Sequence, residues 1–132
     1  MRSGKWRSKP NLHQDFKDLL SVFAEENVSY LIIGGYAVSF YDRPRYTKDL
    51  DLWVKSEPDN PPVRVDILQN VDGVEYERAF AGHLKVDWHG VMVTMISLDD
   101  LIASKRAAGR PQDLVDAENL ELRRRGESGD EF

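Results

Sequence analysis

The stretch Tyr30-Leu-Ile-Ile-Gly-Gly-Tyr36 decides the fold, because a short apolar run ends there in two glycines. The run Val28–Ile33 is rich in β-branched residues and predicts a buried strand, with a tight turn at Gly34-Gly35 and a short helix over Tyr36–Tyr41. Glycines at such a turn let backbone N–H groups approach phosphate oxygens, and the helix N-terminus adds positive potential. A lone pair of glycines is more often just a tight turn, so a phosphate-binding role needs support from residues further along the chain.

Two aspartates come after the turn in a segment of strand character, Lys48–Val54. Asp49 and Asp51 are two residues apart, so in a strand both carboxylates face the same way, with Cα atoms about 6.5–7 Å apart. Two such carboxylates repel each other unless a cation or a basic group lies between them. Their oxygens suit Mg²⁺ or Mn²⁺. The alternative is a solvated strand face neutralised by Arg64.

A third carboxylate, Asp66, lies in the next alternating segment, Val63–Leu68. We expect this segment to pair antiparallel with the Asp-x-Asp strand across the proline-rich loop Lys55–Pro62. That register places Asp66 opposite Asp51 and puts the aliphatic side chains, except that of Leu68, on the other face. A slip of one residue would mix the two faces, which favours this pairing.

The rest of the chain predicts a small mixed sheet flanked by helices, an α/β (α+β) fold. Hydrophobic periodicity, caps and turn residues indicate the remaining elements. We expect a helix capped by Asn11, a helical turn or two over Val74–Ala81, and a hairpin of Leu84–Trp88 and Val91–Ile96. Two helices follow, one over Leu98–Ala108 that ends at Gly109 and a last one that starts at Pro111, with apolar positions Leu114, Ala117 and Leu120. We expect a basic tail over residues 1–10, one domain over 11–125 and a frayed C-terminus over 126–132.

Composition narrows the class of protein. The chain has 132 residues, a formal net charge of −5 and no cysteine, which excludes a disulfide framework and a thiolate zinc site. No run of about 18 apolar residues is present, so we expect no membrane association through a span. The negative charge argues against a protein that coats nucleic acid over its whole surface. We expect a cytoplasmic protein.

Taken together, Tyr30–Tyr36, the segment Arg45-Tyr-Thr-Lys-Asp-Leu-Asp-Leu52 and Asp66 resemble the signature of the DNA polymerase beta-like nucleotidyltransferase superfamily. That signature is an apolar residue, Gly-Gly or Gly-Ser, a spacer, Asp-x-Asp and a third carboxylate on a later strand. The chain is most similar to small AbiEii-like and minimal nucleotidyltransferases, many of which belong to toxin–antitoxin or phage-defence systems. The stretch Leu101–Leu114, with Asp116, resembles their C-terminal motif.

The resemblance implies transfer of a nucleotidyl group from a nucleoside triphosphate such as ATP to an acceptor hydroxyl, with Mg²⁺ or Mn²⁺ as the cofactor. It implies that Asp49, Asp51 and Asp66 ligate metal and carry catalysis. The acceptor would be tRNA or another RNA, a partner protein or a small molecule.

The resemblance also suggests which residues bind the nucleotide. Gly34 and Gly35 would cradle the triphosphate. The further candidates are Arg45, Thr47, Lys105, Arg110 and Asp113. For the basic residues of the later stretch, an exposed helix end is an equally good explanation, since cations favour helix C-termini.

One departure motivates a second hypothesis. Relatives of this type usually place a longer segment, commonly with a helix, between the Asp-x-Asp strand and the third aspartate, where this chain has Lys55–Pro62. The alternative is therefore a catalytically impaired binding module with the same fold, such as an antitoxin or a regulatory partner of a toxin. A metal phosphohydrolase is disfavoured by the Gly-Gly turn and by only three histidines, His13, His83 and His89, which we expect at the surface or in turns.

Overall fold

A computed structural model describes residues 2–5, 13–43, 50–55, 66–68 and 73–126, with the backbone alone for 2–5 and 66–68. The described strands are β1 (Arg2–Lys5), β2 (Tyr30–Ile33), β3 (Asp51–Val54), β4 (Asp66–Leu68), β5 (Leu84–Trp88) and β6 (Val91–Met95). The described helices are α1 (Gln14–Glu25), α2 (Gly34–Tyr41), α3 (Tyr76–Ala81), α4 (Leu98–Ala108) and α5 (Pro111–Arg125). None of these helices has the length and apolar character needed to span a bilayer.

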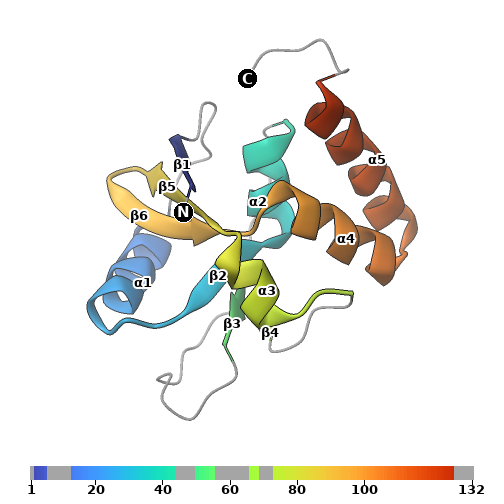
Figure 1. Cartoon of the computed structure of the whole chain (residues 1–132). Helices are drawn as coiled ribbons and strands as arrows, with labels where there is room; N and C mark the ends of the chain where they lie inside the picture. The colour runs from blue at the N-terminus through green and yellow to red at the C-terminus, as the bar shows by residue number, and fades with distance from the viewer. Residues whose placement is uncertain (1, 6–12, 44–49, 56–65, 69–72, 127–132) are drawn as a thin grey trace.

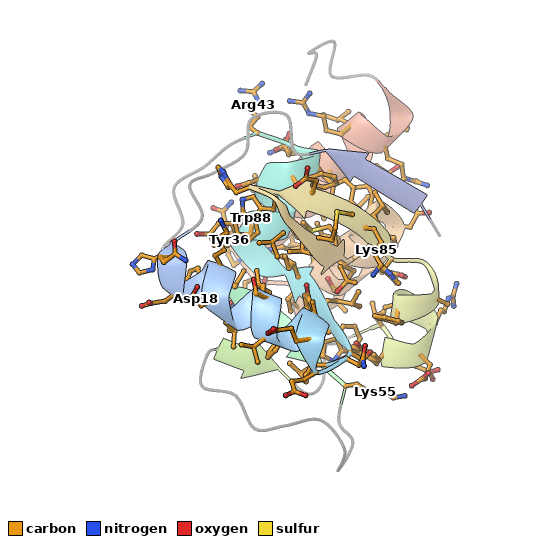
Figure 2. All side chains as sticks on the ribbon, turned by 90° about the vertical axis from the view of Figure 1, so that its left-hand side faces the viewer. Asp18, Tyr36, Arg43, Lys55, Lys85 and Trp88 are labelled. Carbon is orange, nitrogen blue, oxygen red and sulfur yellow. The ribbon has the colours of Figure 1, made fainter. Side chains whose placement is uncertain are left out.

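The described strands form one mixed sheet in the order β1-β5-β6-β2-β3-β4. Parallel and antiparallel neighbours alternate across it, which confirms the predicted α+β class with a mixed sheet. Figure 1 shows α1 on one side of the sheet and α2, α4 and α5 on the other, while Figure 2 views the sheet through α1. The core lies between these layers and includes Leu31, Ile32, Leu52, Val93 and Met95, all fully buried.

The β5–β6 hairpin and the two last helices form as the sequence predicts. His89 and Gly90 have φ values of +53° and +86°, so both central residues of the turn are left-handed, as the type I′ turn that favours hairpins requires. Ser97 caps α4 through Asp100 N at 3.2 Å, and Gly109 ends the helix with φ +72°. Pro111 is the first residue of α5.

The predicted antiparallel pairing of the Asp-x-Asp strand with the Asp66 strand is wrong. β3 pairs antiparallel with β2, and β4 pairs with β3 in parallel. A parallel partner needs a long crossover rather than a tight turn, and residues 55–65 separate the two strands. The predicted partnership survives the change of direction, because Asp51 and Asp66 are still register partners.

Two predictions at the N-terminus are also wrong. The stretch expected to be a basic tail contributes β1, whose backbone pairs in parallel with β5. Its sequence, RSGK, has no apolar alternation, and an edge strand can form through backbone hydrogen bonds without one. His13 caps α1 by accepting a hydrogen bond from Asp15 N at 3.2 Å. Asn11, the predicted cap, lies outside the described residues.

Candidate functional site

The predicted glycine turn lies where β2 passes into α2. Gly34 has a φ of +69°, in the left-handed region that favours glycine. Ile33 is the extended N-cap residue and its aliphatic side chain makes no capping hydrogen bond. The first N–H groups of α2 therefore lack a side-chain cap from the residue that precedes the helix, which is the condition under which a helix N-terminus can bind an anion.

Asp51 lies directly against this turn. It is the register partner of Ile33 across the antiparallel β2–β3 pair, and Leu50 before it is 2% exposed and fixed in the core. A Cβ added to Gly34 would lie 2.3 Å from Asp51 Oδ2 and 3.0 Å from its Cβ and Cγ. No side chain fits at position 34 unless Asp51 moves, so the glycine is required both by its φ and by the carboxylate beside it.

The sheet brings the backbone of the third predicted aspartate next to that of the second. Asp66 is the Cα partner of Asp51 in the parallel β3–β4 pair, and neighbouring strands lie about 4.8 Å apart. The side chain of Asp66 and the whole of Asp49, Arg45 and Thr47 lie outside the described residues. Among the side chains that are described, which include only one of the three aspartates, no group of three His, Cys, Asp or Glu residues could hold a metal ion.

The later candidates form a separate group between α4 and α5. Lys105 Nζ lies 3.3 Å from Asp113 Oδ1 and 3.1 Å from Asp116 Oδ2. The Lys105 side chain is 14% exposed and those of both aspartates are 4% exposed. One buried ammonium thus bridges two buried carboxylates and joins the two helices.

Two further donors complete this cluster. Arg110 Nε donates to Asp113 Oδ2 at 2.7 Å, and Gln112 Nε2 donates to Asp116 Oδ1 at 2.9 Å. Burial pushes the pKa of Asp113 upward, but hydrogen bonds and charges from Arg110 and Lys105 outweigh burial and hold that pKa below its ordinary value. Asp113 is therefore the ionised centre of the cluster.

Of the predicted site residues, the structure thus groups Lys105, Arg110 and Asp113 with each other. Gly34 and Asp51 form the other group, with Gly35 the second residue of α2. The ion pairs with both aspartates already occupy Lys105, so contact with a phosphate would require exchanging at least one of them. Its observed role is to hold α4 against α5.

The predicted apolar face of α5 is confirmed at Ala117 and Leu120 and wrong at Leu114. Leu114 is 49% exposed, whereas Asp113 and Asp116 are each 3% exposed. The buried face follows helical spacing through Asp113, Asp116, Ala117 and Leu120, and two of these four positions are acidic. Counting acidic residues as possible members of the buried stripe would have revealed the cluster, since buried charges occur where they are paired.

A second buried ion pair, between α5 and the end of α2, has no signal in the sequence. Arg123 Nε donates to Asp42 Oδ1 at 2.9 Å, with side chains 6% and 15% exposed. These residues are 81 positions apart, so no local pattern links them.

Nearby on α5, Glu121 accepts hydrogen bonds from Arg124 Nε at 2.9 Å and from Arg106 at 3.2 Å. The hydrogen bond from Arg124 is the main reason that the pKa of Glu121 is lowered.

Burial distinguishes three further side chains. His83 follows the end of α3 in a turn, as one of the two expected settings, but it is 3% exposed and its Nδ1 contacts Phe80 O at 2.5 Å. Trp53 is 2% exposed and packs edge-to-face on Tyr76 with ring centroids 5.1 Å apart. Met92 on β6 is 51% exposed.

A scan against models of known protein families found no match to this chain, and a search of curated proteins found no similar sequence. Assignment of a function therefore rests on the residues of the chain and on their geometry.

Proposed function

We propose that the chain is a divalent-metal-dependent nucleotidyltransferase of the DNA polymerase beta-like type. It would move a nucleotidyl group from a nucleoside triphosphate to an acceptor hydroxyl. The observation that carries the proposal is the contact between the glycine turn and Asp51. A phosphate-binding turn and a metal-binding carboxylate can serve one reaction only when they are adjacent, because a metal held by the carboxylate would supply positive charge to the phosphate bound at the turn.

The residues present fit a metal site of this kind. Asp49, Asp51 and Asp66 supply only oxygen ligands, which Mg²⁺ and Mn²⁺ prefer. Asp51 Oδ2 occupies the space that a Cβ at Gly34 would fill, so backbone rather than side chain borders the carboxylate. When bound, the metal supplies positive charge that stabilises the attacking and leaving oxygens.

The protein's own part in the proposed reaction is binding and orientation. N–H groups at the start of α2 hold triphosphate oxygens, with Gly34 and Gly35 permitting the close approach. The acceptor oxygen forms a bond to the α-phosphorus, the bond between that phosphorus and the bridging oxygen breaks, and pyrophosphate leaves. Asp66 orients the acceptor hydroxyl and takes its proton. Arg45 and Thr47 are assigned to the nucleotide, whereas Lys105, Arg110 and Asp113 support the fold around it.

Transfer of label from each nucleoside triphosphate with Mg²⁺ tests the proposal. Separate arms would contain tRNA or total RNA, protein from lysate, and small hydroxyl compounds. Asp51→Asn should abolish transfer, and Asp18→Asn is the matched control, since Asp18 is an exposed residue of α1 that accepts a hydrogen bond from Gln14 (Figure 2). If wild type and Asp51→Asn transfer equal label in every arm, the proposal is wrong.

The binding-module alternative is favoured by one observation, the neutralisation of Lys105. A cation expected at the phosphates is instead paired with Asp113 and Asp116. Partner capture by wild type and by the double variant Asp49→Asn/Asp51→Asn distinguishes the two functions. Undiminished capture together with absent transfer by the wild type would support the alternative.

A further inference from the structure

A hollow of about 400 Å³ lies at the end of β2 away from the glycine turn. We call it the β2–β6 groove, and the lining residues that matter here are Phe23, Tyr30, Phe80, Lys85, Met92 and Thr94. Tyr30 is the first residue of β2 and Gly34 follows the last, so the two sites are about 13 Å apart along the strand. The groove is therefore distinct from the proposed nucleotide site.

The walls of the β2–β6 groove are aromatic and fixed. Phe23 is fully buried and packs on Tyr30 with ring centroids 5.3 Å apart. Phe80 contacts two other rings, stacked on Tyr76 at 5.8 Å and tilted against His83 at 4.3 Å. Rigid aromatic surfaces of this kind bind flat apolar groups without losing much conformational entropy.

The floor of the groove is polar but already satisfied. Thr94 N donates to the Tyr30 hydroxyl at 3.3 Å, and Thr94 Oγ1 donates to Tyr30 O. Tyr30 and Thr94 are 5% and 8% exposed. These bonds fix β6 against β2, so the shape of the groove does not depend on a ligand.

The charge of the groove comes from Lys85. This residue is half-buried on β5, and Figure 2 places it beside α3, the helix that carries Phe80. No carboxylate in the described part of the chain pairs with Lys85, whereas Lys55 pairs with Glu77 at 3.1 Å and Lys105 with two aspartates. At the rim, Met92 leaves 51% of its surface exposed, which is apolar area that an occupant would cover.

We propose that the β2–β6 groove binds a small aromatic carboxylate, with the ring against Phe80 and Met92 and the carboxylate on Lys85. The volume lies within the range of small-molecule sites, about 300–1,000 Å³, and near its lower end, which suits one ring with a short acidic side chain. A charge-assisted hydrogen bond from an ammonium that pairs with no carboxylate among the described residues would select the anion over a neutral analogue. The inference does not depend on nucleotide transfer.

Titration with phenylacetate, followed by amide chemical shifts of the full chain, tests the proposal. Shifts should concentrate at Tyr30, Phe80, Lys85, Met92 and Thr94. Lys85→Gln should weaken phenylacetate binding about tenfold, the loss that corresponds to one charge-assisted contact, and Lys85→Arg should restore it. Phenylacetamide should bind more weakly to wild type, and its affinity should not change in Lys85→Gln.

Three results would overturn the proposal. The first is an absence of chemical-shift changes at these residues, and the second is equal binding of phenylacetate and phenylacetamide by wild type. The third is self-association of the chain that Met92→Lys abolishes, together with no phenylacetate binding at any chain concentration. A second copy of the chain would then be the occupant of the groove.

Discussion

Replacing Gly34 by alanine tests the contact on which the proposed site depends. The new methyl group would meet Asp51 Oδ2 at 2.3 Å, and the Cβ and Cγ of the same residue at 3.0 Å. Rotating the carboxylate alone cannot relieve contacts to Cβ, so either β3 or the start of α2 must shift. At the same time alanine would be held at a φ of +69°.

The expected cost has two parts. A left-handed conformation costs a residue with a Cβ about 1–2 kcal/mol, and forcing an extra methyl into a packed site costs about 1–3 kcal/mol. We therefore expect Gly34→Ala to lower the free energy of unfolding by about 2–5 kcal/mol. Because the shift moves Asp51, nucleotidyl transfer and triphosphate binding should be lost under conditions in which the variant is still folded.

Gly109→Ala is the matched control, because it places an alanine at a positive φ without a steric clash. Gly109 has a φ of +72°, and a Cβ there would meet only carbonyl oxygens at 3.8 and 3.9 Å, which is ordinary contact. Urea unfolding of both variants, monitored by circular dichroism, measures how much each substitution lowers the free energy of unfolding. Label transfer measures their nucleotidyltransferase activity. The reasoning is refuted if Gly34→Ala is no less stable than Gly109→Ala and transfers as well as wild type.

Three other predictions concern α4 and α5. Lys105→Met would leave Asp113 and Asp116 buried without their shared cation, and urea unfolding should show a loss of about 3–5 kcal/mol; a loss below about 1 kcal/mol, the usual value for exposed pairs, would mean that the cluster is solvated. The pKa of Asp113 is lowered in the folded chain, so below about pH 4 the unfolded chain binds the proton first and stability falls as pH falls. Unfolding free energies measured down to about pH 2 should fall less steeply for Asp113→Asn than for wild type, and equal slopes would contradict the lowered pKa. Leu114→Gln should change stability by less than about 0.5 kcal/mol, whereas Leu120→Ala should cost about 2–5 kcal/mol; a comparable loss at both positions would restore the apolar face first expected.

Sequence patterns correctly predicted the turns and helix ends that depend on residues close to each other in the sequence. The hairpin turn at His89-Gly90 and the end of α4 at Gly109 each depend on a few neighbouring residues, and both form as expected. The glycine turn was predicted for the same reason, because the conformational freedom of glycine and its place between a strand and a helix are enough to indicate it.

Long-range partnerships were predicted less well, because a single pair of facing residues can be correct while the direction of the strand, and with it the rest of the register, is wrong. The alternation of Asp51 and Asp66 with apolar neighbours identified the partners. It could not show that β2 takes the antiparallel side of β3 and leaves β4 the parallel one.

Burial of charge was the other source of error. The cluster around Lys105 and the Asp42–Arg123 pair place charged side chains in the interior, where hydrophobic periodicity assigns aliphatic ones. Arg123 and Asp42 are 81 positions apart, which no sequence window spans. The Lys105 cluster is close in sequence, but its aspartates occupy positions that hydrophobic periodicity does not count as buried. The exposure of Leu114 is the consequence on the opposite face of α5.

The most direct test of the proposed carboxylate site is Mn²⁺ binding in the presence of a non-hydrolysable triphosphate, followed by electron paramagnetic resonance. We predict that the triphosphate strengthens Mn²⁺ binding to wild type and to Asp18→Asn, and that Asp49→Asn/Asp51→Asn loses this strengthening while remaining folded. Equal, triphosphate-dependent Mn²⁺ binding by the double variant would contradict the assignment of these aspartates to the metal.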